Sequence, residues 1–324
     1  MSVALSPWQA RAYAQVLVAL EAGRLPHALL IGGAVHLGKR ALARRLANRL
    51  MCSSPQQAEA CGQCRNCTLI AAGTHPDLLE ETFELNDKGE PRKEILIAQM
   101  RRLTEKLMLT PQIAAGQVAL IHPAEAMNRS AFNALLKTLE EPPSGRTIIL
   151  ISDQPQRLPA TIRSRCQWLR VDLPPRAEAL AWLVARGWDE HSAGEALDAA
   201  QGNPGLALNY LTDKGLTLRR SVAKDLVALA EQRESAVAVA STWAEDGPAR
   251  RLRFCGELLR DHLAARHGAQ RADLLAQAGL RHVRDPFALA TWFDASVRTL
   301  NGLDGPMRND LQIAELLLGW QRLG

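Results

Sequence analysis

Short apolar runs in the first half of the chain predict the strands of a buried sheet. The clearest runs cover residues 27–32, 118–122 and 147–153, and they consist mainly of Leu, Ile, Val and Ala. Short runs that are apolar at consecutive positions are typical of parallel strands buried on both faces. We therefore expect these three segments to be strands of a buried parallel sheet.

Between these runs the apolar residues recur at helical spacing. After residue 40, leucines stand at every fourth position, and residues 95–109 and 128–141 each carry an apolar stripe. Asn128 or Ser130 is a plausible N-cap for the last of these helices. Strands alternating with helices indicate an α/β domain whose sheet is covered on both faces.

Beyond Pro174-Pro175 the strand pattern disappears and the chain predicts helices only. The expected helical segments are 176–186, 192–211, 219–232, 248–267, 271–283, 286–300 and 309–323, with breaks at 202–205, 213–215 and 246–248. We expect one domain boundary near residue 171 and another near 212. The predicted domains are therefore 1–170, 171–212 and 213–324.

Composition and charge limit the possible classes of protein. Apolar residues make up 47% of the chain but aromatic residues only 4%, so Ala and Leu must fill most of the core. Residues 1–170 carry 21 Lys and Arg against 14 Asp and Glu, while residues 171–324 carry 18 against 20. A basic front half is compatible with a nucleotide or nucleic acid nearby and equally with a solvated surface.

The chain carries no pattern for export or membrane insertion. It has no apolar stretch long enough to span a membrane, and no basic segment precedes an apolar core at the N-terminus. We therefore expect a cytoplasmic protein, in which structural disulfides are rare.

Four of the six cysteines are close together in the sequence, at Cys52, Cys61, Cys64 and Cys67. Two pairs three residues apart are the spacing with which a tight loop turns thiolates toward one metal ion. Four thiolates complete the tetrahedral shell of a structural Zn²⁺ and leave no open position for catalysis. The alternative is a cluster of free thiols.

Residues 33–40 resemble a phosphate-binding loop, G-x-x-x-x-G-K-[ST], in all but the last position. Gly33, Gly38 and Lys39 are present, but Arg40 stands where a Ser or Thr hydroxyl would bind Mg²⁺. Arginine has no acceptor oxygen, so it cannot replace that ligand. The alternative is an ordinary turn between a strand and a helix.

A second requirement for ATP hydrolysis is also missing. An ATPase of this type needs an acidic pair at the end of a strand, but the 118–122 run continues into Pro123 and Ala124. Glu125 lies one residue too far along, and we interpret it as a cap for the next helix. The sequence therefore predicts no intrinsic ATP hydrolysis, and it leaves nucleotide binding through the vestigial loop open.

Three further motifs carry a resemblance to a known family. Residues 135–143 read LLKTLEEPP, residues 161–166 read TIRSRC, and residues 74–77 read THPD. Together with the loop and the cysteine cluster, they make the chain similar to the clamp-loader ATPase family of the AAA+ class. The resemblance covers residues 24–212, and beyond them only length and helical character match.

The resemblance implies a three-domain subunit. Its parts would be a RecA-like domain with a zinc module at 52–67, a small helical lid at 171–212 and an all-α collar at 213–324 that joins other subunits. In this family a five-subunit assembly opens a sliding clamp and loads it onto primed DNA, so the implied partners are ATPase motor subunits and a clamp-opening subunit. The clamp and DNA would be reached through the assembly.

The resemblance also assigns roles to residues. In Ser164-Arg165-Cys166, Arg165 would be an arginine finger that reaches the ATP of the adjacent motor subunit. The lid arginine that senses ATP in active members falls near Pro204-Gly205 and is absent here. The implied function is that of a non-hydrolysing clamp-loader subunit.

Two other functions remain as alternatives. An active motor subunit of the same family would need a hydroxyl at position 40 and an acidic pair at 122–123, and it has neither. A zinc-stabilised DNA-binding protein that acts alone would need a stronger basic patch or a helix-turn-helix, and no such motif is evident.

Overall fold

The chain folds into two compact units. In this computed structural model the described residues are 4–268, 272–280, 285–303 and 305–323. Unit 1 comprises residues 1–185 with the short segment 202–206, and unit 2 comprises residues 186–201 and 207–324. Each unit is considered by itself below. The predicted three-domain division at 171 and 213 stays a prediction.

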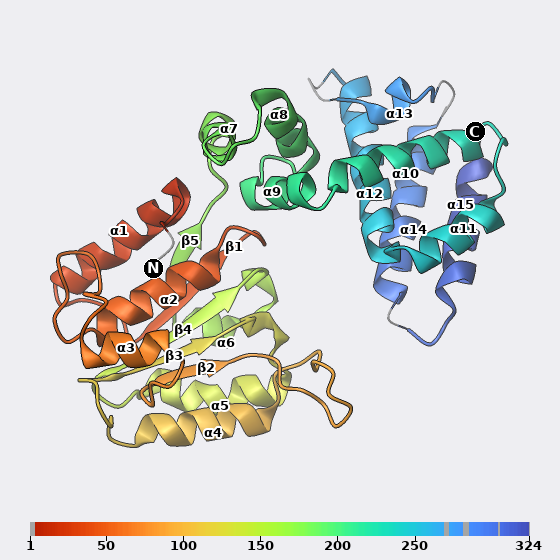
Figure 1. Ribbon diagram of the computed structural model, residues 1–324. Coiled ribbons are helices and arrows are strands. Elements are labelled where there is room, and N and C mark those ends of the chain that lie inside the picture. The colour runs from red at the N-terminus through yellow and green to blue at the C-terminus, as the bar shows by residue number, and fades with distance from the viewer. Residues whose placement is uncertain (1–3, 269–271, 281–284, 304, 324) are drawn as a thin grey trace. The chain divides into compact units, whose positions relative to one another are not determined.

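Unit 1 is built on one five-stranded sheet, in which every strand pair is parallel (Figure 1). Across the sheet the order is β2-β3-β4-β1-β5. The strands are β1 (Ala28–Gly33), β2 (Leu78–Glu81), β3 (Gln117–Ile121), β4 (Arg146–Ser152) and β5 (Gln167–Val171). The three strands predicted from apolar runs are the three central strands, and the two strands that the sequence did not reveal lie at the edges.

The edge position explains why β2 and β5 were missed. In β2 the second half is Glu80-Glu81, and in β5 exposed and buried positions alternate, so neither strand is a continuous apolar run. The central strands are buried at almost every position, because each has neighbours on both sides and helices on both faces.

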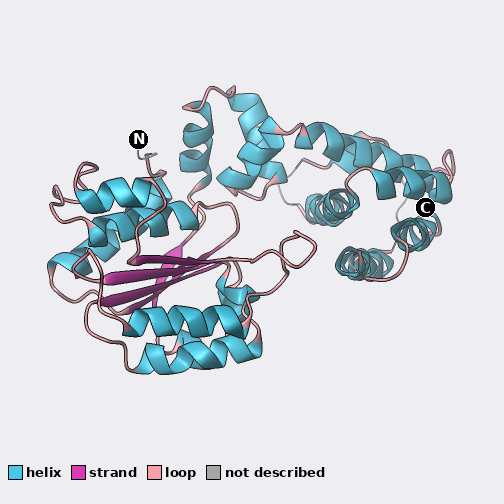
Figure 2. Cartoon of the chain, turned by 60° about the horizontal axis from the view of Figure 1, so that its bottom comes forward, coloured by secondary structure: helices cyan, strands magenta, loops and turns pink. Residues whose placement is uncertain are grey.

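Helices cover both faces of the sheet (Figure 2). On one face α1 (Pro7–Glu21) and α2 (Lys39–Met51) close a core that contains Leu29, Ile31 and Ile149. On the other face α4 (Ile97–Met108) and α5 (Arg129–Glu140) close a core around Leu30, Ile148 and Leu150. Alternate residues of each strand face opposite cores, as the period of a strand requires.

The predicted helices of unit 1 are present, with additions. The apolar stripes at 95–109 and 128–141 form α4 and α5, and Asn128 caps α5 because its side chain accepts the N–H of Ala131. The sequence did not reveal α1, α3 (Arg65–Ala71) or the short α6 (Ala160–Arg163). Unit 1 also contains the single-turn helices η1 (Ala124–Ala126) and η2 (Pro155–Arg157), and α7 (Arg176–Val184).

The described part of unit 2 is helical. Its helices are α8 (Glu190–Ala199), α10 (Gly215–Ala230), α11 (Ala236–Glu245), α12 (Pro248–Arg266), α13 (Leu274–Gln277), α14 (Pro286–Gly302) and α15 (Asn309–Gln321). Between α8 and α10, α9 (Pro204–Thr212) begins in unit 1 and ends in unit 2. The predicted helix 192–211 is therefore two helices, divided at the break expected near 202. The sequence missed α11, and part of the predicted helix 271–283 lies outside the described residues.

Tryptophans anchor the core of unit 2. Trp320 is fully buried and its indole N–H donates to the carbonyl of Leu226 at 2.7 Å, while Trp292 packs on it with ring centroids 4.7 Å apart. A buried ion pair joins Arg219 to Asp261 at 2.7 Å. A few aromatic anchors thus complete a core that is otherwise built of Ala and Leu. Among the described residues, no helix is long and apolar enough to cross a membrane.

Asp77 fixes the segment that leads into β3. Its side chain is fully buried, and its carboxylate accepts the N–H groups of Gln112, Ile113 and Ala114 at 2.8 to 2.9 Å. Burial alone would raise the pKa of Asp77, but these three donors together hold it below its usual value. The ionised carboxylate therefore organises the loop.

We expect Asp77→Asn to loosen this loop. An amide offers one acceptor oxygen and places an N–H₂ against backbone donors, which should cost about 2 kcal/mol of local stability. Amide hydrogen exchange at residues 112–114 should then become roughly thirtyfold faster at neutral pH. Because the folded pKa is depressed, the difference should be complete above about pH 4 and disappear as the pH falls further.

The exposed carboxylate of Asp87 offers the matched control, and Asp87→Asn should leave exchange at 112–114 unchanged. Equal exchange in the wild-type protein and Asp77→Asn at neutral pH would contradict the role given to Asp77.

Candidate functional site

The loop that resembles a phosphate-binding loop connects β1 to α2. Gly38 is the residue before α2 and has a φ of 75°, a conformation that favours glycine. A Cβ at this position would lie 2.3 Å from the side-chain nitrogen of Gln9, which itself donates to the carbonyl of Gly38 at 2.7 Å. The indole of Trp8 donates to the carbonyl of Leu37 at 3.1 Å. Helix α1 therefore holds the loop from one side.

The lysine of the loop is engaged with its own chain. Lys39 is 3% exposed, and its ammonium group lies 2.5 Å from a carboxylate oxygen of Asp153 and 2.5 Å from the carbonyl of Ala34. Asp153 follows β4 directly, so the order of the sheet brings it beside the start of α2. A buried ammonium needs such partners, because removing one would leave an uncompensated charge.

Arg40 is directed toward a different acid. Its guanidinium lies 3.7 Å from Glu80 on β2. Glu80 also accepts two hydrogen bonds from Arg44, one from Nε at 3.1 Å and one from Nη2 at 2.6 Å. The pairs are half exposed, so their contribution to stability is small. Arg40 offers no oxygen to a metal ion, as the sequence predicted.

The end of β3 carries a histidine where an ATPase would have its acidic pair. His122 is half buried, and burial lowers its pKa, which favours the neutral imidazole. The carboxylate of Glu125 accepts the N–H of Asp153 at 3.0 Å, and its second oxygen is buried with no partner among the described residues. Our interpretation of Glu125 as a helix cap is therefore wrong, because Asn128 caps α5.

The outer side of the loop is covered by the start of α9. The side chain of Asn203 donates to the carbonyl of Val35 at 2.8 Å. A Cβ on Gly205 would lie 1.8 Å from the carbonyl oxygen of His36, so only glycine permits this approach of the two backbones. Each of the five carbonyls from residue 34 to residue 38 thus lies against another residue of unit 1.

Arg165 lies between α6 and β5, in the segment Ser164-Arg165-Cys166. Its guanidinium donates to the carbonyl of Thr161 at 2.9 Å and is 2.5 Å from a carboxylate oxygen of Glu140. Arg165 and Glu140 are 34% and 48% exposed. Glu140 ends α5 and belongs to the LLKTLEEPP motif, so the fold brings two motifs of the sequence together through an ion pair.

The neighbours of Arg165 differ in environment. The hydroxyl of Ser164 is exposed and donates to the carbonyl of Thr161 at 3.2 Å. Cys166 is buried, which raises its pKa to about 11 and keeps the thiol protonated at neutral pH. Cys166 therefore packs in the core and is no nucleophile. Cys255 is fully buried as well.

The four clustered cysteines converge in space. All four sulfur atoms lie within 4.8 Å of one another. The Sγ atoms of Cys52 and Cys64 are 3.9 Å apart, and those of Cys61 and Cys67 are 4.0 Å apart. Four sulfurs at about 2.3 Å from a tetrahedral metal ion would be about 3.8 Å apart. The geometry can therefore hold one metal ion.

The surroundings of the sulfur atoms lower the pKa of one of these cysteines and raise the pKa of another. The N–H groups of Gln63 and Cys64 donate to Cys61 and lower its pKa. Burial and the neighbouring sulfurs raise the pKa of Cys67 to about 12. A cation at the centre of the cluster would favour loss of that proton.

A hydrogen-bonded chain links the cluster to the sheet. Asn66, which lies between two of the cysteines, donates to the carbonyl of Met51 at 2.7 Å and faces His75 Nε2 at 3.2 Å. His75 Nδ1 accepts the N–H of Asp77, so Nε2 carries the proton that Asn66 accepts. Burial lowers the pKa of His75, which agrees with a neutral ring.

The sequence did not indicate a role for Gln9, Asp153 and Asn203, and it marked Glu140 only as part of the LLKTLEEPP motif. Two of these residues could have been found from the local sequence. Glu140 is the acid at the end of an apolar helical stripe, and Asp153 is the acid that follows an apolar strand. Gln9 and Asn203 could not have been found in this way, because both act through backbone carbonyls that are distant in the sequence.

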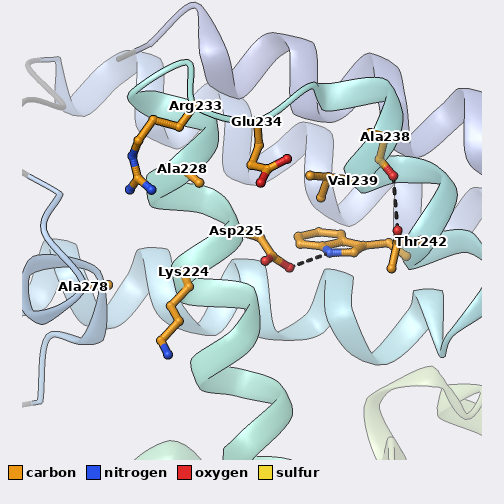
Figure 3. Close-up of a pocket in the computed structure, with 10 residues that line it drawn as sticks. Lys224, Asp225, Ala228, Arg233, Glu234, Ala238, Val239, Thr242 and Ala278 are labelled. Carbon is orange, nitrogen blue, oxygen red and sulfur yellow. Dashed lines mark hydrogen bonds between the residues drawn. The ribbon is translucent and has the colours of Figure 1, made fainter.

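A separate cavity of about 450 Å³ lies in unit 2 (Figure 3). It is lined mainly by α10 and α11, and Asp225 there accepts the indole N–H of Trp243 at 2.9 Å. Acidic and basic side chains are mixed around it, including Lys224, Arg233 and Glu234. It contains none of the residues that the sequence marked.

These features define a class of protein: a parallel α/β domain with a loop that resembles a phosphate-binding loop, an arginine in a Ser-Arg-Cys segment and a Cys₄ cluster. A family model described as "DNA polymerase III, delta subunit" matches residues 8–175. The DNA polymerase III subunit delta' of Pseudomonas aeruginosa is 39% identical over 241 residues, which are 73% of this chain and 70% of the relative.

The corresponding subunit of Escherichia coli is 34% identical over 277 residues, covering 85% of this chain and 80% of the relative. The chain belongs to the delta' subunit family of DNA polymerase III. It is also similar to another subunit, tau of Escherichia coli, at 38% identity over 147 residues, which are 45% of this chain and 22% of tau.

Proposed function

We propose that this chain is a non-hydrolysing subunit of a clamp loader that serves DNA replication. It would help to load the sliding clamp onto primed DNA and would supply Arg165 to the ATP of a neighbouring subunit. The observation that carries the proposal is the closed loop, in which Lys39 pairs with Asp153 instead of facing open solvent. Membership of the delta' family supports the setting in replication.

The closed loop argues against ATP hydrolysis by the chain itself. A phosphate would have to displace Asp153 from Lys39. Mg²⁺ would meet Arg40 in place of a hydroxyl and His122 in place of an acid. This combination favours the non-hydrolysing subunit over the alternative of an active motor.

The isolated chain should show no ATP turnover above a sample without protein. Arg40→Thr should remain inactive too, because the acidic pair is still missing and Lys39 stays engaged with Asp153. Steady-state phosphate release measures both, with an ATPase subunit of the complex as the positive control. Turnover by the wild-type chain alone would contradict the proposal and favour an active motor.

Arg165 has the chemistry that a neighbouring ATP requires. Its guanidinium is a planar fork with a permanent charge, which suits phosphate oxygens. Because its pair with Glu140 is partly exposed, that pair contributes about 1 kcal/mol or less, so a phosphate group can replace it. The side chain is therefore held near the surface without being committed to the core.

Arg165→Ala should reduce the DNA-stimulated ATPase and clamp loading of the reconstituted complex. An arginine finger typically contributes about 10³–10⁵ to turnover at its own site, and the total loss should be smaller because only one of several sites receives this arginine. Arg165→Lys should restore little, since an ammonium lacks the fork.

Arg163→Ala is the matched control, because Arg163 is an exposed arginine two residues away that lies outside the Ser164-Arg165-Cys166 segment. Wild-type clamp loading by Arg165→Ala would show that the Ser-Arg-Cys segment is only a loop.

We also propose that Cys52, Cys61, Cys64 and Cys67 bind one structural Zn²⁺. The sulfur spacing fits a tetrahedral ion, and four protein ligands leave no position for substrate. When bound, the ion would fix the 52–67 segment and, through Asn66 and His75, the start of β2.

Metal analysis should give one zinc ion per chain, and Cys64→Ser should lower this sharply. Chelation should increase hydrogen exchange in residues 52–77, because structural zinc sites supply folding free energy. Cys255→Ala, outside the cluster, should keep its metal. A purified wild-type chain without metal, or with a disulfide between Cys61 and Cys64, would exclude the site.

The remaining parts of the proposal concern partners. Residues 171–212 would form a helical lid and residues 213–324 a collar that binds other clamp-loader subunits, which include ATPase motor subunits and a clamp-opening subunit. The similarity to tau supports an assembly of related chains. DNA and the clamp would be reached through that cytoplasmic assembly, and no feature favours a zinc protein that binds DNA alone.

A further inference from the structure

Trp168 is unusual among the tryptophans of this chain. It is 43% exposed, whereas the other six tryptophans are buried or partly buried. Among the large apolar side chains that are exposed in the described part of unit 1, it is the one aromatic residue. Tryptophan combines a large apolar ring with a polar N–H and is enriched at protein interfaces.

The side chain of Trp168 is held in a defined position. The residue lies on the edge strand β5 and shares a sheet face with Leu30 and Gly32, because Leu30 is its partner in register. Gly32 has no side chain, and a Cβ there would lie 2.7 Å from the indole nitrogen and 2.6 Å from Pro155. The indole therefore lies against the bare backbone of β1.

Arg170 completes this arrangement. Its guanidinium lies 4.6 Å from the centre of the Trp168 ring, within the range of a cation–π contact. Between residues 154 and 171 the chain carries four arginines and no acidic residue, Asp153 and Asp172 border this segment, and Glu140 pairs with Arg165. A rigid aromatic ring next to arginines is the composition that is enriched in protein interface hot spots.

We propose that Trp168, with Arg170, is an anchor of the interface with the neighbouring ATP-bearing subunit. This inference rests on the proposed function of Arg165, which lies only three residues away. The two Cα atoms can be at most about 11 Å apart. A standard interface covers about 800 Å² per partner, which corresponds to a patch of about 16 Å radius. An interface centred on Arg165 is therefore wide enough to include Trp168.

Charge supports the same partner. The triphosphate that Arg165 would reach is strongly negative, and the arginine-rich surface around Trp168 is complementary to it. Single-stranded nucleic acid is another ligand of aromatic and basic surfaces, but it usually requires several aromatic residues in a row. Unit 1 presents a single exposed aromatic residue in its described part, so the protein partner is favoured.

The test separates binding from catalysis. The full-length chain is labelled and assembled with the ATPase subunits of its complex, and its dissociation rate is measured during a chase with excess unlabelled chain. Trp168→Ala should dissociate on the order of tenfold faster, since most interface substitutions act on dissociation. ATPase at saturating chain concentration should stay within about twofold of wild type.

Two further variants complete the experiment. Trp168→Phe keeps a ring and should fall between wild type and Trp168→Ala. Leu85→Ala is the control, because Leu85 is 64% exposed just beyond β2, at the opposite edge of the sheet, and should dissociate like wild type.

Arg165→Ala should show the opposite pattern, with lower ATPase at saturation and near-normal dissociation, so that a failure of the proposed function can be told apart from a failure of the anchor. Unchanged dissociation of both Trp168 variants would overturn the anchor. It would also be overturned if the isolated chain bound a single-stranded oligonucleotide and lost that binding in Trp168→Ala.

Discussion

The ion pair between the buried ammonium of Lys39 and the carboxylate of Asp153, whose side chain is 29% exposed, is the interaction on which the closed form of the loop depends. In a phosphate-binding loop the lysine must be available to phosphate, but here it is 3% exposed and bound to a carboxylate and a carbonyl of its own domain. A buried ammonium that lost its carboxylate would be left uncompensated. The pair therefore keeps the loop in one conformation, and the contacts of Gln9, Asn203 and Gly205 hold the same conformation from outside.

The closed loop and the accessible arginine fit one account. At the positions where its own ATP would require a hydroxyl and an acidic pair, the chain has Arg40 and His122. The carbonyls of its loop are bound by other residues of unit 1. Where it would serve another subunit, Arg165 lies near the surface in a weak pair with Glu140, and Trp168 lies on the adjacent edge strand. The lysine ammonium that a motor subunit would direct to its nucleotide is here bound by groups of its own domain and stabilises the fold.

The sequence predicted the centre of unit 1 well because the central strands are buried on both faces and read as apolar runs. It also predicted the cysteine cluster, since short spacing brings ligands together without any long-range contact. The edge strands β2 and β5 were missed because edge positions are half polar, and Glu125 was misread because its partner, the N–H of Asp153, comes just after β4, 28 residues further along the chain. Pairs such as Lys39–Asp153 and Arg165–Glu140 follow from the order of the strands and helices, which local patterns do not contain.

Equilibrium binding of a fluorescent ATP analogue to the isolated full-length chain, with and without Mg²⁺, tests the central claim most directly. If Lys39 is committed to Asp153 and the loop is closed, the titration should show no saturable binding at micromolar concentrations, and Mg²⁺ should make no difference. Saturable binding in the micromolar range that Mg²⁺ strengthens would contradict the account, because it would require an open loop and a metal ligand that Arg40 does not provide.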